Sequence, residues 1–88
     1  MIPFTLEKCK TRAGYSAKLP SPRKLNLSCI KKEFEVLLET PILLVVKVEG
    51  LEIVVHGFGE LLFKNGKDDQ INVMRNVAQK VYDLGLKN

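Results

Sequence analysis

The stretch FEVLLETPILLVVKVEGLEIVVHGFGELLFK, residues 34–64, decides the fold. It is rich in β-branched and other apolar residues, and turn-forming residues divide it at Pro41, Gly50 and 57–59. Short apolar pieces separated by tight turns predict strands of an antiparallel sheet. We expect these strands over residues 34–39, 42–49, 51–56 and 60–64.

The first of these pieces is ambiguous, because its apolar residues also fit a helical stripe that begins at Ile30. We favour a strand from Phe34. The alternative is that a short helix expected over residues 26–33, capped by Asn26 or Ser28, continues into this piece.

Residues 67–84 have the pattern of an amphipathic helix. The apolar stripe consists of Ile71, Met74, Val77, Ala78, Val81 and Leu84. Asp68 or Asp69 is expected to cap the first turn, and Gly85 is expected to end the helix in a left-handed conformation. Together these elements predict an α+β fold with two layers, an antiparallel sheet with helices on one face, in the order β-α-β-β-β-β-α.

The N-terminal third differs from the rest of the chain in charge. Residues 1–33 carry eight basic and two acidic residues, whereas the whole chain has a net charge of +4. We expect a first strand over residues 2–10. Residues 11–24 are expected to form a basic loop, because two prolines and a glycine interrupt regular structure there. Such a loop indicates either an anionic partner or only improved solubility.

Length and composition exclude several classes of protein. The 88 residues form one domain, 1–88, and an apolar content of 45% is typical of a globular chain. No apolar run reaches the ~18 residues of a membrane span, and no signal-peptide pattern is present, so we expect a cytoplasmic protein with no membrane association. Cys9 and Cys29 are expected to be free thiols, with a single bridge as the alternative, and no cofactor or metal site is predicted.

The predicted order of elements is similar to one half of the TATA-binding-protein-like fold, which consists of a strand, a helix, four meandering strands and a helix. The ending VAQKVYDLGL, residues 77–86, resembles the close of such a repeat. The resemblance implies a sheet with an open face. It does not imply the family's mode of DNA binding, because that mode needs two repeats and the open face expected here carries several carboxylates, which repel phosphate.

The central stretch is apolar on both sides of the expected sheet, and this observation carries the leading hypothesis. The side chains expected to form an apolar strip on the open face are Leu37, Leu43, Val45 and Val54. Contiguous exposed apolar patches mark contact sites, and a two-fold interface matches a patch to itself. We therefore predict a non-catalytic binding module that associates as a homodimer or with another protein.

Two further hypotheses compete with this one. The runner-up is nucleic-acid binding by the basic loop, with cations for phosphates and one aromatic ring for stacking. Its candidate contacts are Lys10, Arg12, Tyr15, Lys18, Arg23 and Lys24. The third hypothesis is a small enzyme that uses His56 with Cys9 or Cys29, which requires these side chains to lie within hydrogen-bond reach. No spacing in the sequence favours it, so no catalytic residue is assigned.

Overall fold

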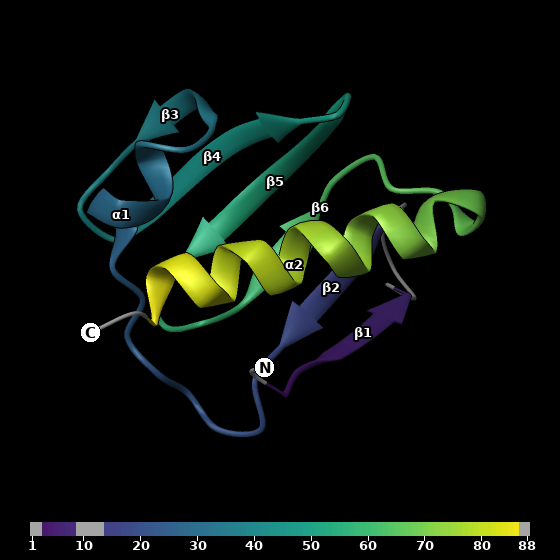
Figure 1. The fold of residues 1–88 in the computed structure, drawn as a ribbon, viewed down its shortest axis with the longest axis horizontal. Coiled ribbons are helices and arrows are strands. Elements are labelled where there is room, and N and C mark those ends of the chain that lie inside the picture. Colours follow the sequence, from purple (N-terminus) through teal and green to yellow (C-terminus); the bar gives the residue numbers. More distant parts are fainter. Residues whose placement is uncertain (1–2, 9–13, 87–88) are drawn as a thin grey trace.

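The structure, a computed structural model, describes residues 3–8 and 14–86. Their secondary-structure elements are shown in Figure 1. The elements are β1 Thr5–Lys8, β2 Tyr15–Lys18, α1 Leu27–Lys31, β3 Glu35–Glu39, β4 Leu43–Val48, β5 Leu51–His56, β6 Leu61–Phe63, a 3-10 turn η1 Asp68–Gln70 and α2 Ile71–Gly85.

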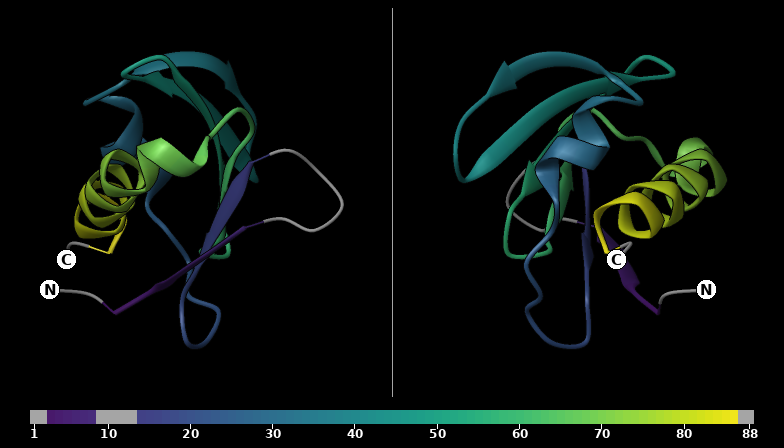
Figure 2. Two further views of the ribbon diagram at one scale, coloured as in Figure 1. Left: turned by 90° about the vertical axis from the view of Figure 1, so that its right-hand side faces the viewer. Right: turned by 60° about the vertical axis from the view of Figure 1, so that its left-hand side comes forward.

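The strands of the described ranges form one antiparallel sheet in the order β1-β2-β6-β5-β4-β3. Both helices lie on the same side of it, as the two views of Figure 2 show. The predicted α+β fold, with an antiparallel sheet and helices on one face, is confirmed. The piece that begins near Phe34 is a strand, as favoured, and not a continuation of α1.

Strand β2 is the main difference from the prediction, because the observed order is β-β-α-β-β-β-β-α. The expected loop over 11–24 is wrong for residues 15–18, which pair with β1 on one side and β6 on the other. Ser16 and Ala17 have little intrinsic strand preference. Two ladders of backbone hydrogen bonds and complete burial of Ala17 stabilise the strand instead.

Gly14 allows β2 to enter the sheet. Its φ is +126°, and a Cβ at this position would collide with the carbonyl oxygen of Phe63 in β6. Only glycine accepts this backbone conformation and this close approach without strain. The chain therefore turns into β2 directly beside β6.

The hydrophobic core lies between the sheet and α2. From the strands it receives one set of alternating side chains, and from α2 the predicted apolar stripe. The fully buried members with the largest side chains are Ile30, Leu44, Val46, Leu51, Ile53, Val55, Leu61, Phe63, Met74, Val81 and Tyr82. Alternation along the strands therefore sends every second side chain to the opposite, uncovered face.

Tyr82 connects α2 to two separate parts of the sheet. Its buried hydroxyl lies 3.1 Å from the carbonyl oxygen of Ala17 in β2 and 2.7 Å from that of Gly59 in the β5–β6 turn. Its ring contacts that of Phe4, with 5.3 Å between the centroids. Burial, with a smaller effect of the negative charge of Glu60, raises the pKa of Tyr82 far above its ordinary value.

Both ends of the C-terminal helix differ from the prediction. At the start, the backbone N–H of Lys67 donates to the Gln70 side chain (3.1 Å), and neither Asp68 nor Asp69 is the cap. At the end, Gly85 remains helical and is buried. A Cβ on Gly85 would lie 2.9 Å from Cδ1 of Ile30, so glycine at this position permits close packing of α1 on α2 rather than a left-handed turn.

Asp68 joins the start of the helical segment to the first hairpin. Its carboxylate accepts a 2.6 Å hydrogen bond from the Tyr15 hydroxyl and lies 3.2 Å from the ammonium group of Lys8. The hydrogen bond from Tyr15, followed by the hydrogen bond and charge of Lys8, lowers the pKa of Asp68 below its ordinary value of 3.8. The ionised form of Asp68 is therefore the one that stabilises the fold.

We predict that Asp68→Asn reduces the pH dependence of stability. A carboxyl group whose pKa is lowered by folding stabilises the protein above its unfolded-state pKa, and this contribution is lost as the pH falls through the lower, folded-state pKa. The unfolding temperatures of wild type and variant should therefore differ near neutral pH and converge as the pH falls below 3.8 and through the lower, folded-state pKa.

Asp69→Asn is the matched control, because Asp69 lies in the same turn and has no hydrogen bond or ion pair among the described side chains. Thermal unfolding followed by circular dichroism at several pH values measures both variants. Equal behaviour of the two variants would contradict the role assigned to Asp68.

We predict that Gly14→Ala destabilises the protein by about 3 kcal/mol, because it combines a left-handed backbone with a collision against β6. Gly50→Ala separates the two effects: Gly50 also has a positive φ (+81°), but a Cβ there would meet nothing within 4 Å. The control should lose only about 1 kcal/mol, measured by urea unfolding. Equal losses would show that β2 does not approach β6 as described.

Candidate functional site

A β-bulge in β3 decides which side chains occupy the open face. Val36 lies opposite Val46, but Leu38, not Leu37, lies opposite Val45. Leu37 is the extra residue, so one more side chain is accommodated in β3 than in β4. The sequence placed Leu37 on the apolar strip, whereas the register of the sheet gives that position to Leu38.

Four apolar side chains form a continuous row across the open face. Because residues directly opposite each other in antiparallel strands share a face, the register connects β3, β4, β5 and β6 in one line. We call this line the apolar row: Leu38, Val45, Val54 and Leu62. Leu38 is 53% exposed and the other three are half-buried. Leu43, the remaining predicted member, lies in the next row beside His56.

A row of charges borders the apolar row. Glu35 lies opposite Lys47, Lys47 lies opposite Glu52, and the backbone N–H of Lys64 donates to the carbonyl oxygen of Glu52 (3.0 Å). We call this line the charged row: Glu35, Lys47, Glu52 and Lys64. The signs alternate across the sheet, so the row carries no net charge. Neighbouring members attract each other and keep this border of the open face hydrated.

His56 and Cys29 are not brought together. His56 is at the end of β5 and shares the open face with Leu43, whereas α1, which carries Cys29, lies on the covered side of the sheet. The His56 ring instead stacks on Phe58, with 5.1 Å between centroids and 24° between planes. Cys29 is a free, half-buried thiol, and Cys9 lies outside the described residues. The third hypothesis, an enzyme built on these side chains, gains no support from this arrangement.

The structure separates the residues of the predicted basic surface. Tyr15 was the aromatic ring expected to stack on a base. It is buried in the core and donates a hydrogen bond to Asp68, so it is not available for stacking. Lys10 and Arg12 lie outside the described residues. Lys18 is exposed at the end of β2. Arg23 and Lys24 are exposed in the segment between β2 and α1, where they line a groove.

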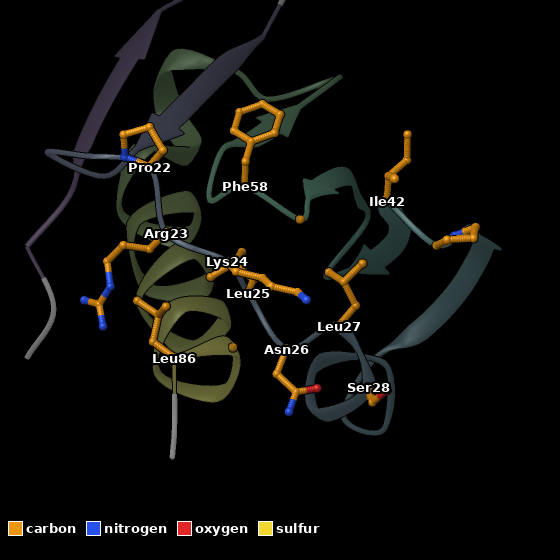
Figure 3. A pocket seen from close by; sticks show the side chains of 13 residues that line it. Pro22, Arg23, Lys24, Leu25, Asn26, Leu27, Ser28, Ile42, Phe58 and Leu86 are labelled. Carbon is orange, nitrogen blue, oxygen red and sulfur yellow. The ribbon is translucent and has the colours of Figure 1, made fainter.

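This groove lies at the end of the sheet where two turns meet the helices (Figure 3). It has a volume of about 1170 Å³. The lining comes from four segments: 22–28 before and at the start of α1, 41–42 in the β3–β4 turn, 57–58 in the β5–β6 turn, and 85–86 at the end of α2. Segments far apart in sequence thus form one concave surface.

Backbone hydrogen bonds hold the groove together. The N–H of Arg23 donates to Phe58 O (3.0 Å), and that of Leu25 donates to Gly57 O (2.8 Å). The N–H of Asn26 donates to Gly85 O (2.8 Å). Lys24 therefore lies between two residues with fixed backbones, and the buried Leu25 side chain anchors the segment in the core. The cations of this segment are carried by an ordered backbone.

Two exposed apolar side chains of the groove were not identified from the sequence. Phe58 is 54% exposed and Ile42 is 73% exposed, and neither belongs to the core or packs against it. From the sequence, Ile42 was expected at the start of a strand and Phe58 in a turn, but β4 begins at Leu43 and leaves Ile42 in the turn before it. Their only available signal was the presence of large apolar residues next to Pro41 and between two glycines, where a turn needs none.

In residues 3–8 and 14–86, no group of three or more His, Cys, Asp or Glu side chains is placed to hold a metal ion. Neither described helix has the length and apolarity that a membrane crossing requires.

From β2 to α2, the element order is the one implied by the resemblance to a TATA-binding-protein-like unit, with β1 added before it. Likeness in element order does not establish membership, so the family assignment stays a prediction. Comparison of the chain with protein-family models, with curated proteins and with solved structures finds no match.

Proposed function

We propose that this protein is a small, non-catalytic binding module that associates with a second copy of itself through the open face of its sheet. The apolar row is the observation that carries this proposal. It crosses four adjacent strands, and the helices of the described chain lie on the opposite side. Covering such a row removes apolar surface from water, which favours association by roughly 25 cal/mol per Å².

The dimensions of the face suit a small two-fold interface. Six strands at a spacing of about 4.8 Å make a sheet roughly 24 Å wide. Two sheets pack face to face at about 10 Å, with their side chains interdigitating. The half-buried valines are small and Leu38 projects further, so the surface is uneven enough for side chains of two copies to interdigitate.

The charges of the face favour a second copy as the partner. In a two-fold contact each surface meets itself, so a border of one sign would repel its own copy. The charged row alternates two acidic and two basic members, Glu35, Lys47, Glu52 and Lys64. Its net charge is zero, so two copies of the row do not repel each other. A strongly acidic or basic partner would find no complementary field there.

Association through the β3 edge of the sheet is disfavoured. The outer edge of β3 carries Glu35 and Glu39, and its bulge interrupts the regular spacing of donors and acceptors. Charges and bulges on edge strands are features that prevent pairing with another sheet. The face, rather than the edge, is therefore the surface that we assign to self-association.

Leu37 and Leu38 provide a matched pair of variants for testing this proposal. They are neighbours in β3 with similar exposure, 45% and 53%, but only Leu38 belongs to the apolar row. We predict that Leu38→Lys weakens self-association at least tenfold, because it places a charge within the buried interface. Leu37→Lys adds the same charge beside the row and should change association much less.

Light scattering over a range of micromolar concentrations measures the mass of each variant, and thermal unfolding verifies that each is folded. Wild type should have twice the mass of one chain, and Val45→Lys should behave like Leu38→Lys. A monomeric wild type would contradict the proposal. Equal effects of Leu37→Lys and Leu38→Lys would contradict the assignment of the interface to the apolar row.

A further inference from the structure

The groove combines two chemical features that the sequence keeps apart. Arg23 and Lys24 come from the segment before α1, and Phe58 comes from the β5–β6 turn more than thirty residues later. The backbone hydrogen bond from Arg23 N–H to Phe58 O brings the cationic segment beside the β5–β6 turn. The Lys24 side chain extends toward the hollow, whereas that of Arg23 points away from Phe58 (Figure 3). Figure 3 shows the side chains of Phe58, Lys24, Leu27 and Ile42 around the same hollow.

The groove has a positive charge. Its lining includes Arg23 and Lys24 but no aspartate or glutamate. A smaller hollow is also lined by Pro22 and Phe58. Its lining contains one basic residue, Lys18, and one acidic residue, Glu60, so it has no net charge. An anionic ligand would therefore be attracted to the Arg23–Lys24 side of the Phe58 ring. Because backbone hydrogen bonds hold this segment, binding has to order the two side chains but not the main chain.

Phe58 offers a flat apolar surface next to these charges. Its ring is stacked on the His56 ring, and more than half of the residue is exposed. Burial in the core does not explain an aromatic ring in this position, since Phe58 is not a member of the core. Stacked on His56, the ring forms a supported platform that can accept one further planar group.

The groove is wide and open rather than an enclosed pocket for a small molecule. Its volume of about 1170 Å³ exceeds the roughly 300–1,000 Å³ of such pockets. It is formed along the turns at the end of the sheet, and exposed apolar side chains such as Ile42 lie along it. This shape is suited to a chain passing across the surface.

We propose that the groove binds single-stranded nucleic acid, with one base stacked on Phe58 and adjacent phosphates near Arg23 and Lys24. Positive grooves with aromatic platforms are the means by which proteins hold single strands without reading their sequence. A duplex keeps its bases stacked on one another, so it has none to offer to Phe58. An acidic peptide would satisfy the cations but would not need a planar ring, which makes it the less favoured occupant.

The proposal does not rest on self-association, because the groove and the apolar row have no residue in common. Binding of labelled oligouridylate and oligothymidylate to the full chain, followed by fluorescence anisotropy, tests it. We expect binding at low salt that weakens with a logarithmic slope of about −1.4 for two phosphate contacts. Lys24→Gln should reduce the slope by about 0.7, whereas Lys32→Gln, the same change outside the groove lining, should leave it unchanged.

Substitutions at Phe58 distinguish a base from a peptide. We expect Phe58→Leu, which keeps an apolar side chain but removes the plane, to weaken binding by about fivefold or more, and Phe58→Trp to preserve it. Because Phe58 is exposed, all variants should unfold at nearly the wild-type temperature. The RNA and DNA probes show which sugar is preferred.

Three outcomes would overturn the proposal. The first is no binding of either single strand at low salt. The second is equal binding of a duplex of the same length. The third is unchanged binding by Phe58→Leu together with displacement of the oligonucleotide by a polyglutamate peptide, which would identify the groove as a site for acidic peptides.

Discussion

Packing of α2 against one face of the sheet is the interaction on which the rest of the structure depends. The buried side of α2, centred on Met74, Val77 and Val81, meets the inward side chains of β4, β5 and β6. A chain of this size buries only about 60–65% of the surface that its unfolded form exposes. It therefore has little apolar sequence left to form a second layer that would cover the other face of the sheet. Covering one face well therefore leaves the other face open.

The C-terminal part of α2 has a second role, because it positions the segments around the groove. Tyr82 places its hydroxyl between β2 and the β5–β6 turn, within hydrogen-bond distance of one carbonyl oxygen on each. One turn later, Gly85 allows Leu25 and Ile30 to approach, and its carbonyl accepts from Asn26. Both sets of contacts join residues distant in sequence. The exposed groove is thus a consequence of how the core closes at this end of the helix.

The two surfaces that result have different chemistry. The open face is apolar at its centre and neutral along the charged row, which suits a contact between two copies. The groove is positive and has an aromatic platform, which suits a polyanion. The groove adjoins the open face at His56, on which the Phe58 ring is stacked, but the groove lining and the apolar row have no residue in common. A dimer formed through the open face would therefore carry two grooves, and two linked sites bind an extended strand more tightly than one.

Hydrophobic periodicity determined the class of the fold and most of its elements. The strands after Phe34, the break at Pro41, the turn at Gly50 and the amphipathic C-terminal helix are all local patterns, because strand and helix repeats are properties of neighbouring residues. The existence of an open apolar face follows from the same alternation. These features required no knowledge of which strand lies beside which.

Only the tertiary structure decided the features that depend on contacts between distant residues. Tyr15–Lys18 is a strand because β1 and β6 pair with it, and its own composition gave no such signal. The β3 bulge, visible only in the pairing with β4, places Leu38 rather than Leu37 on the apolar row. Tyr15 is a core residue. Phe58, not Tyr15, is the aromatic residue next to the cationic segment, because backbone hydrogen bonds join residues 23–25 to the β5–β6 turn. Pairing partners are chosen by the packing of the whole chain, so no local window of the sequence contains them.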